Sequence, residues 1–330
     1  MDIILSLITQ VAILFVMMVP GILLKKFDLV NDSFGKGLSN LVLYIAQPAL
    51  ILYAYLAYDG DGSIWLNALW VLIFSVVAHF LFAGIAIMHF RGAEDGQRRM
   101  LRFATVFSNA AFMGIPLISV LLGPEATIYA SIYNISFNVF LWSLGVYFCT
   151  VRRDEDGDGI PDGEHKVKPK ISPLKVALHP VNIAAVIGIL PLALGITSYI
   201  PEFVMGCLEM LKSLVAPLAM VVIGLRMAGM SFRGTFRDKY LYLFLGFRHF
   251  ALPILVLGVM WLLSVVGFSF SSTVVTVTLL LAATPAATSA TMFAEKYDCD
   301  AVYTSRIVII STLLSIVSMP LLVLLSSLIF

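Results

Sequence analysis

Charged residues are scarce in this chain. Only 12% of its 330 residues are Asp, Glu, Lys or Arg, whereas 60% are hydrophobic and the mean hydropathy is +0.98. This composition excludes a soluble globular domain and is typical of polytopic membrane proteins, which are surrounded by membrane lipid. The formal net charge is +1 and the basic residues form no patch, so the sequence gives no sign of a nucleic-acid partner.

Cysteine and enzyme motifs are also lacking. The three cysteines imply no disulfide framework. The sequence contains no H-E-x-x-H, no G-x-S-x-G, no Walker loop and no G-x-G-x-x-G after a strand. No pair of Asp residues, or Ser with Lys, lies at matching depth in the apolar runs, which disfavours an intramembrane enzyme. We therefore expect neither enzymatic activity nor a resident cofactor.

What the chain does contain is a series of long apolar runs. Each is long enough to cross the roughly 30 Å of hydrocarbon in a bilayer. The runs lie at about 3–24, 38–57, 64–90, 103–122, 126–150, 174–197, 203–228, 240–266, 272–294 and 301–330. They predict an all-α polytopic membrane protein with ten transmembrane helices.

The second half of the chain repeats the plan of the first. Pro116 and Pro285 lie 169 residues apart, and so do Pro48 and Pro217. This shared offset indicates an internal duplication. Five helices per repeat is an odd number, so the two repeats are expected to be inverted relative to each other in the membrane. The predicted parts are a first five-helix repeat at 1–150, a cytoplasmic linker at 151–175 and an inverted five-helix repeat at 176–330.

The distribution of basic residues predicts the orientation of these helices. Connections after the odd-numbered spans are basic, as with Lys25 and Lys26 after the first and Arg98 and Arg99 after the third. Connections after even-numbered spans, such as 59–62, carry no Lys or Arg. The positive-inside rule then places both termini outside the cytoplasm. We expect a multi-pass protein of the cytoplasmic (inner) membrane of a bacterium.

The paired prolines Pro116 and Pro285 are expected to break the fourth and ninth helices. Proline lacks an N–H and disfavours helix at the preceding residue, so such a break persists in lipid only where it is buried in protein or lines a cavity. If each helix restarts at its proline, two helix N-termini can hold an anion near the membrane midplane. The candidate substrate-binding residues at the breaks are Ser108, Asn109, Met113, Gly114, Ile115, Pro116, Thr284, Pro285, Ala286, Thr288 and Ser289.

Three amide side chains in other spans are further substrate-binding candidates. Gln47 precedes a proline in the second span, and Asn134 and Asn138 lie one helical turn apart on one face of the fifth. The alternative interpretation of each is an interhelical hydrogen bond, worth about 0.6 kcal/mol.

Ionisable residues inside the bilayer are costly and are usually functional. His79 in the third span and Arg248 with His249 in the eighth occupy matching places in the two repeats. We expect them to support the site or its coupling near the pseudo-axis. The alternative for these residues is snorkelling or helix capping.

The linker contains an acidic string with the spacing of a calcium loop. Carboxylates stand at positions 1, 3, 5 and 9 of the string, with a glycine at position 6 for the turn. Position 12 is His165 rather than the bidentate Glu of an EF-hand, so the other interpretation is a solvated acidic linker. The candidate calcium ligands are Asp154, Asp156, Asp158 and Asp162.

Two segments also carry a family resemblance. S-N-A-A-F-M-G-I-P-L in the fourth span and A-A-T-P-A-A-T-S-A in the ninth resemble the auxin efflux carrier family, specifically its bacterial members, and the resemblance covers the whole chain. It implies that the fourth and ninth helices cross at their prolines. It also implies a scaffold of helices 1, 2, 6 and 7, a moving domain of helices 3–5 and 8–10, and a homodimer formed through the scaffold. By the same resemblance Asn109 contacts a substrate carboxylate.

The function that follows is secondary active transport of small organic anions by alternating access. Plant members of the family export indole-3-acetate, and bacterial members are associated with malonate or malate, so monocarboxylates and dicarboxylates both remain candidates. The sodium symporters related to this family use a Glu that has no counterpart near Pro285, and the coupling ion, proton or sodium, stays open. The alternative is a transporter-like sensor that binds such an anion and signals through a partner.

Overall fold

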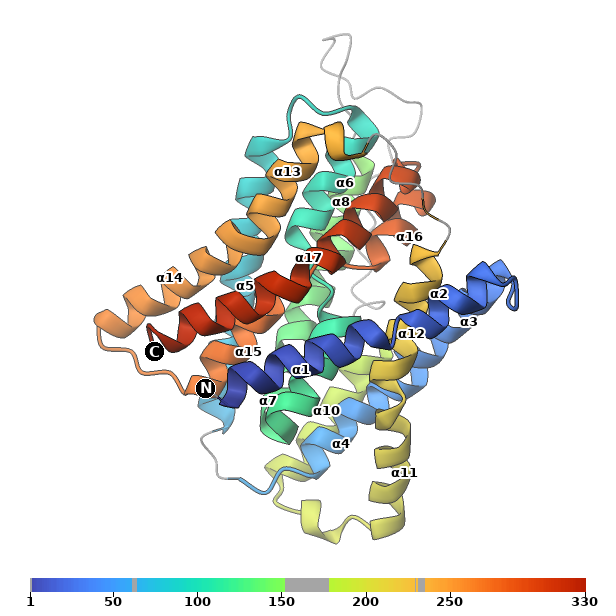
Figure 1. Ribbon diagram of the computed structural model, residues 1–330. Coiled ribbons are helices and arrows are strands. Elements are labelled where there is room, and N and C mark those ends of the chain that lie inside the picture. The colour runs from blue at the N-terminus through green and yellow to red at the C-terminus, as the bar shows by residue number, and fades with distance from the viewer. Residues whose placement is uncertain (1, 61–63, 152–177, 229, 231–234) are drawn as a thin grey trace.

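A computed structural model describes the chain except residues 1, 61–63, 152–177, 229 and 231–234 (Figure 1). The described part is helical and contains no strand, apart from an isolated β-bridge between Ser108 and Ala286. The predicted calcium ligands Asp154, Asp156, Asp158 and Asp162 lie outside the described residues, as does nearly all of the predicted linker.

The first half of the described chain contains α-helices and three π-helical turns. In order they are α1 (Asp2–Val16), α2 (Val19–Lys26), α3 (Asp32–Leu41), η1 (Val42–Ala46), α4 (Gln47–Leu56), α5 (Ile64–His89), α6 (Asp95–Val106), η2 (Ala110–Gly114), α7 (Ile115–Phe140), η3 (Leu141–Gly145) and α8 (Val146–Thr150).

The second half of the described chain contains α-helices, one π-helical turn and two short 3-10 helices. In order they are α10 (Pro180–Ala193), η4 (Thr197–Tyr199), α11 (Glu202–Ser213), α12 (Val215–Met227), η5 (Thr235–Arg237), α13 (Lys239–Gly246), η6 (Phe247–Ala251), α14 (Leu252–Val265), α15 (Ser272–Ala283), α16 (Ser289–Lys296) and α17 (Ala301–Ser327).

Seven helical segments of the described part are long and apolar enough to cross a membrane. They are Leu5–Lys26, Ser33–Leu56, Ile64–His89, Ala110–Thr150, Glu202–Met227, Lys239–Val265 and Ala301–Ser327.

This number differs from the ten predicted spans for two physical reasons. The fourth and fifth predicted spans fall largely within one 41-residue segment, but Gly123 interrupts its helical path with φ 76° and ψ −160°, directly before Pro124. Only glycine adopts such backbone angles without strain. The sixth and ninth predicted spans are represented by α10 and α15, which are apolar but only 14 and 12 residues long.

Three prolines inside the apolar segments each follow a π-helical turn. Pro48, Pro116 and Pro253 are the second residues of α4, α7 and α14, which η1, η2 and η6 precede directly. A proline inside a regular α-helix clashes with the carbonyl four residues earlier and cannot bond to it. The wider turn accommodates the ring, so these prolines distort the helices without ending them.

The helices pack as two groups that meet along α7. On one side, α10 and α11 pack against α4, and α12 packs against α2 and α3. On the other, α15 packs against α5, α14 and α17, and α16 packs against α17. The two chain ends lie close together, with α1 beside α17 (Figure 1). Between the groups, α7 contacts both α4 and α15 and therefore connects them.

Large apolar side chains cover much of the outer surface. Leu5 on α1, Leu190 on α10 and Leu262 on α14 are each more than half exposed. An exposed apolar surface of this extent is unfavourable in water but matches a lipid environment.

Candidate functional site

Two interrupted helices lie against each other in the protein interior. The first break, residues 107–109, separates α6 from η2, and the second break, residues 284–288, separates α15 from α16. The backbone of both breaks is extended in part, and all their described non-proline side chains are buried. The two breaks run antiparallel, with Ser108 opposite Ala286 in the β-bridge.

Backbone groups of the two breaks form hydrogen bonds with each other. Asn109 N donates to Pro285 O at 2.7 Å, and Ala287 N donates to Phe107 O at 2.9 Å. These are groups that an uninterrupted helix would pair internally and that lipid cannot pair at all. The fourth and ninth predicted spans therefore contact each other at their breaks, and each interruption depends on the other.

The expectation that the first break lies at Pro116 is wrong. The helix α6 ends at Val106, ten residues before Pro116, and the chain is continuously helical from η2 into α7 through Pro116. In η2 the backbone N–H of Ile115 donates to Ala110 O, five residues earlier. The next bond of this kind would run from residue 116 to Ala111 O, but residue 116 is a proline and has no N–H. The side-chain amide of Gln47 donates to Ala111 O at 2.8 Å and replaces the bond that proline cannot make. Gln47 thus supports the turn from the neighbouring segment.

Asn109 occupies the start of the restarting helix. Its backbone oxygen accepts hydrogen bonds from Met113 N and Gly114 N, both at 3.1 Å, so it begins the turn whose first amide groups have no acceptor within the helix. Its side chain is 2% exposed, and its Oδ1 accepts from the hydroxyl of Thr288 at 3.5 Å. Its Nδ2 is buried and has no hydrogen-bond partner among the residues that the structure describes. An unpaired buried donor at a helix N-terminus is suited to hold an anion.

A hydroxyl and imidazole network holds the second break. Ala286 N donates to Ser311 Oγ at 3.0 Å, and that oxygen lies 2.8 Å from His249 Nε2. The other ring nitrogen, Nδ1, lies 2.8 Å from Ser318 Oγ. The sequence interpretation identified His249 but missed both serines of α17, although Ser311, Ser315 and Ser318 share one face at helical spacing. His249 thus acts on the break through Ser311.

Arg248 is fully buried and contacts backbone rather than acidic groups. Its Nε and Nη2 donate to Thr284 O at 3.0 and 2.7 Å, Nη2 also donates to Ala282 O at 2.7 Å, and Nη1 donates to Thr105 O at 3.1 Å. These carbonyls belong to the C-terminal ends of α15 and α6, where the helix dipole is negative. In the part of the chain that the structure describes, no carboxylate forms an ion pair with it. Arg248 therefore caps both helices immediately before their breaks.

His79 does not join His249 in a pair. Its Nδ1 donates to Ser75 O at 2.7 Å, and its ring stacks on Phe140 with centroids 4.9 Å apart. The guanidinium carbon of Arg248 lies 5.9 Å from the ring of Phe82, which is on α5, the helix that also carries His79. Arg248 thus lies near the helix of His79, but the two side chains have different hydrogen-bond partners.

The residues at the junction of η2 and α7 pack closely against the end of α15. Met113, Gly114 and Ile115 are buried at the junction of η2 and α7. A Cβ atom on Gly114 would lie 2.7 Å from Leu281 Cδ2 and 3.2 Å from Thr284 Cγ2. Only glycine allows this approach of η2 to the end of α15. Ser289, in contrast, lies one residue beyond the second break and is half-buried.

The two asparagines of the fifth predicted span have different surroundings. Asn138 donates from Nδ2 to Asn182 Oδ1 on α10 at 3.3 Å, which is the interhelical hydrogen bond of the alternative interpretation. Asn134 is also buried, but in the described part of the chain its Oδ1 has no hydrogen-bond partner.

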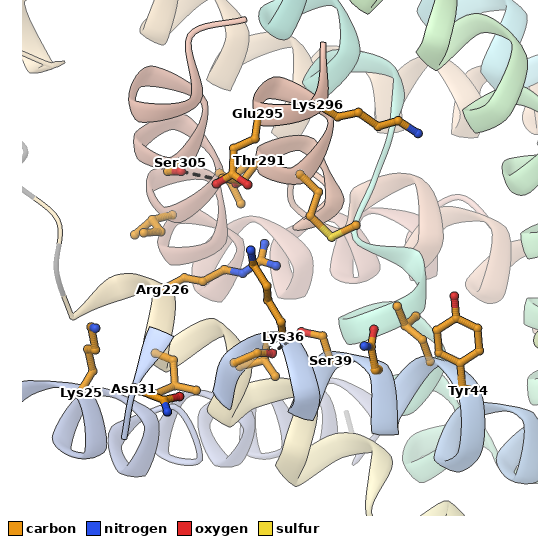
Figure 2. Close-up of a pocket in the computed structure, with 18 residues that line it drawn as sticks. Lys25, Asn31, Lys36, Ser39, Tyr44, Arg226, Thr291, Glu295, Lys296 and Ser305 are labelled. Carbon is orange, nitrogen blue, oxygen red and sulfur yellow. Dashed lines mark hydrogen bonds between the residues drawn. The ribbon is translucent and has the colours of Figure 1, made fainter. Parts of the chain in front are cut away.

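A cavity of about 730 Å³ lies beside the second break (Figure 2). Its walls come from α2, α3, η1, α12, α16 and α17, and its charged lining residues are four basic and one acidic: Lys25, Lys36, Arg226, Lys296 and Glu295. Arg226 donates from Nη1 to the carbonyl of Thr288 and so joins the cavity to the break. The sequence interpretation used Arg226 for topology alone, because nothing in the sequence brings α12 next to α16.

Long apolar segments, two of them interrupted and paired deep in the protein, define a multi-pass membrane protein. The chain matches the family described as "Membrane transport protein" over residues 6–323, and it therefore belongs to this family, that of the auxin efflux carriers.

Two relatives have similar sequences along much of their length. An uncharacterized transporter of Methanothermobacter thermautotrophicus is 25% identical over 308 residues, which cover 93% of this chain and 94% of the relative. An uncharacterized transporter of Methanocaldococcus jannaschii is 25% identical over 224 residues, covering 66% and 68%. Family and relatives agree that the chain is a membrane transporter.

Proposed function

We propose that this protein is a secondary active transporter of small organic anions that binds its substrate where the two breaks cross. The observation that carries the proposal is the Nδ2 of Asn109, which is buried without a hydrogen-bond partner among the described residues. It lies at the start of η2, where the first-turn amides have no acceptor within the helix. A carboxylate placed there receives a side-chain donor and backbone donors, and it lies at the positive end of a helix dipole. The hydroxyl of Thr288 is within reach of the same point.

The charges around the breaks support an anion rather than a cation. Neither break contains Asp or Glu, and Arg226 donates directly to the second one. A cation at this depth would require carboxylate or several carbonyl ligands. The carbonyls of Ala282 and Thr284, however, are already bonded to Arg248.

We further propose that the chain crosses the cytoplasmic membrane ten times as two inverted repeats, with both termini outside. Supporting this count are the interruption at Gly123, which divides the 41-residue segment, and the apolar helices α10 and α15. The helix α15 is followed by the second break and by α16, and an interrupted span needs fewer helical residues on each side of its break.

Alternating access in this proposal uses the two packing groups as its moving parts. The group around α4, α10, α11 and α12 is the scaffold and dimer contact, and the group around α5, α15, α16 and α17 carries the crossing breaks. Because α7 contacts both groups, movement between them changes which side of the membrane the breaks face.

Uptake of radiolabelled anions into proteoliposomes tests this function. Asn109→Ala removes the unpaired donor and is expected to lower uptake of mono- and dicarboxylates by about tenfold or more, since a hydrogen bond to a charged group is worth about 1.5–3 kcal/mol. Asn182→Ala is the matched control, because it also deletes a buried amide but at the contact of α10 with α7. It should leave uptake close to wild type.

The same assay separates transport from the sensor alternative. A sensor binds the anion without moving it, so saturable binding with no accumulation inside the vesicles would favour the sensor. Uptake that is equal in Asn109→Ala and wild type would place the substrate site elsewhere.

A further inference from the structure

Two of the three cysteines come together although 150 residues separate them in the chain. Cys149 is the penultimate residue of α8, and Cys299 lies in the turn between α16 and α17. The Sγ of Cys299 lies 3.8 Å from the backbone oxygen of Cys149, and the two thiols are within hydrogen-bonding distance of each other. Both are free thiols in this structure.

Arg99 on α6 holds the two segments in this position. Its Nη1 donates to Cys149 O at 2.6 Å and to Tyr297 O at 3.3 Å, and its Nη2 donates to Asp298 O at 2.8 Å. A single guanidinium, only 4% exposed, thus binds both the end of α8 and the turn that carries Cys299. The helices also pack together, with α8 beside α6 and α16 (Figure 1). The contact between the thiols therefore belongs to a buried, hydrogen-bonded cluster.

The two thiols differ in their access to solvent. Cys149 is fully buried, with the Sδ of Met100 4.0 Å from its Sγ, whereas Cys299 is partly exposed. The hydrogen bond with Cys149 lowers the pKa of the Cys299 thiol despite its partial burial, and the positive charge of Arg99 acts in the same direction. The thiolate is the reactive form of cysteine, so an oxidant that reaches this pair reacts first at Cys299.

We propose that Cys299 and Cys149 form a redox modification site, at which hydrogen peroxide generates a reversible disulfide between the two halves of the chain. The sulfur of Cys299 attacks one peroxide oxygen, and cleavage of the O–O bond leaves a sulfenic acid on Cys299 and releases one water. The sulfur of Cys149 then attacks that of Cys299, and the hydroxyl group leaves as a second water with the proton of Cys149. Two thiols are oxidised, and one peroxide is reduced to two waters.

The proposed topology places the turn between α16 and α17 on the cytoplasmic side. Cytosolic thiols are kept reduced, and disulfides formed there are usually transient or redox-sensing. The site is therefore open in an unstressed cell and closes under peroxide stress. The closed bond prevents further oxidation of Cys299 to sulfinic acid, and it restricts the unfolded chain by linking residues far apart in sequence. This inference goes beyond transport and uses the proposed topology only for the redox setting.

The test is oxidation of the purified protein in detergent, with Cys207→Ser as background so that only this pair of thiols remains. After one equivalent of hydrogen peroxide, both free thiols should disappear. A non-reduced digest should contain the peptide of Cys149 linked to that of Cys299, and dithiothreitol should restore both thiols. The midpoint of thermal unfolding should rise on oxidation and return on reduction, because the bond closes a long loop of the chain.

Single substitutions separate the two steps. In Cys149→Ser, Cys299 should form a sulfenic acid that dimedone traps, and no linked peptide should appear. In Cys299→Ser, the buried Cys149 should keep its free thiol over the same time. Serine is close to cysteine in size, so both variants are expected to fold. Cys207 in the unsubstituted protein is the matched control, because it is an exposed thiol on α11 and should appear in no link with Cys149 or Cys299.

The thiol state is read directly, so failure of the proposed transport function would leave these results unchanged. Oxidation of Cys299 to sulfinic acid without a linked peptide would overturn the site. Disulfides found only between two molecules, or formed equally well with Cys207, would overturn it as well. Equal rates of oxidation at Cys149 in Cys299→Ser and at Cys299 in Cys149→Ser would contradict the assigned order of reaction.

Discussion

At the scale of single residues, Arg248 shows how a charge can be buried without an acid. Its guanidinium bonds to the carbonyls of Thr105, Ala282 and Thr284, which would otherwise be unpaired at two helix ends. Lysine has one charged nitrogen and cannot reproduce this fork. The residue is therefore expected to stabilise the protein whatever its further role.

Arg248→Lys should accordingly lower the midpoint of thermal unfolding in detergent by several degrees, as each buried carbonyl left without a donor costs about 1–3 kcal/mol. Tryptophan fluorescence on heating measures this. Arg91→Lys, on an exposed arginine, is the control and should unfold like wild type. Equal midpoints for all three proteins would mean that these hydrogen bonds contribute nothing to stability.

The sequence predicted the polar residues of the breaks because polar groups stand out in apolar runs, and Ser108, Asn109 and Thr288 indeed lie there. It did not predict their partners. Ser311 and Arg226 become visible only when α17 and α12 are placed beside α16, since a serine in an apolar helix and an arginine near a helix end are individually unremarkable positions.

At the scale of elements, the prolines and the π-helical turns explain each other. The sequence predicted a break at Pro116, but the ring is accommodated by η2, and Gln47 Nε2 supplies the missing donor for Ala111 O. Local sequence rules treat proline as a helix terminator because they cannot include a donor from another segment. The true interruption lies where Pro285 and Ala287 offer backbone partners.

A double-mutant cycle tests this exchange of donors. Gln47→Leu should destabilise the protein by about 1 kcal/mol or more, because Ala111 O loses its donor. Pro116→Ala restores a backbone N–H at residue 116, so Gln47→Leu should cost less in that background. Denaturation in mixed micelles gives the coupling energy. Strict additivity of the two changes would show that the amide and the proline act independently.

Pro116→Ala is also expected to weaken anion uptake. With a donor at residue 116, η2 can relax to a regular α-helix, which rotates Asn109 relative to α7 and moves its Nδ2. The initial uptake rate of a dicarboxylate should therefore fall, though by less than in Asn109→Ala. Wild-type uptake in Pro116→Ala would contradict a role of the π turn in aiming Asn109.

At the scale of the whole molecule, hydropathy predicted an all-helical membrane protein and most of its span boundaries. It did not show which helices would be short or interrupted, because α10 and α15 are apolar throughout and Gly123 is one residue in a 41-residue segment. Proline spacing predicts an internal duplication, whereas the pairing of the breaks requires the tertiary structure.

Charge asymmetry predicts the orientation, and thiol labelling in intact cells can measure it. In a background with the exposed Cys207 changed to serine, Ser269→Cys between α14 and α15 should react with a membrane-impermeant maleimide from outside. Ser33→Cys at the start of α3 should react only after permeabilisation. The reverse pattern would invert the topology and turn the cavity of Arg226 to the outside.

The mutual pairing of the breaks also sets an order for biogenesis. Asn109 N and Phe107 O find their partners only in Pro285 and Ala287, which the ribosome reaches about 180 residues later. At roughly 5–20 residues per second, these backbone groups of the nascent first half lack their partners for roughly 9 to 36 seconds, and lipid cannot replace those partners. During that interval we expect a translocon or chaperone to keep these groups of the N-terminal half away from lipid. The N-terminal half then completes its fold only after the second half has been inserted, and does not fold as an independent unit.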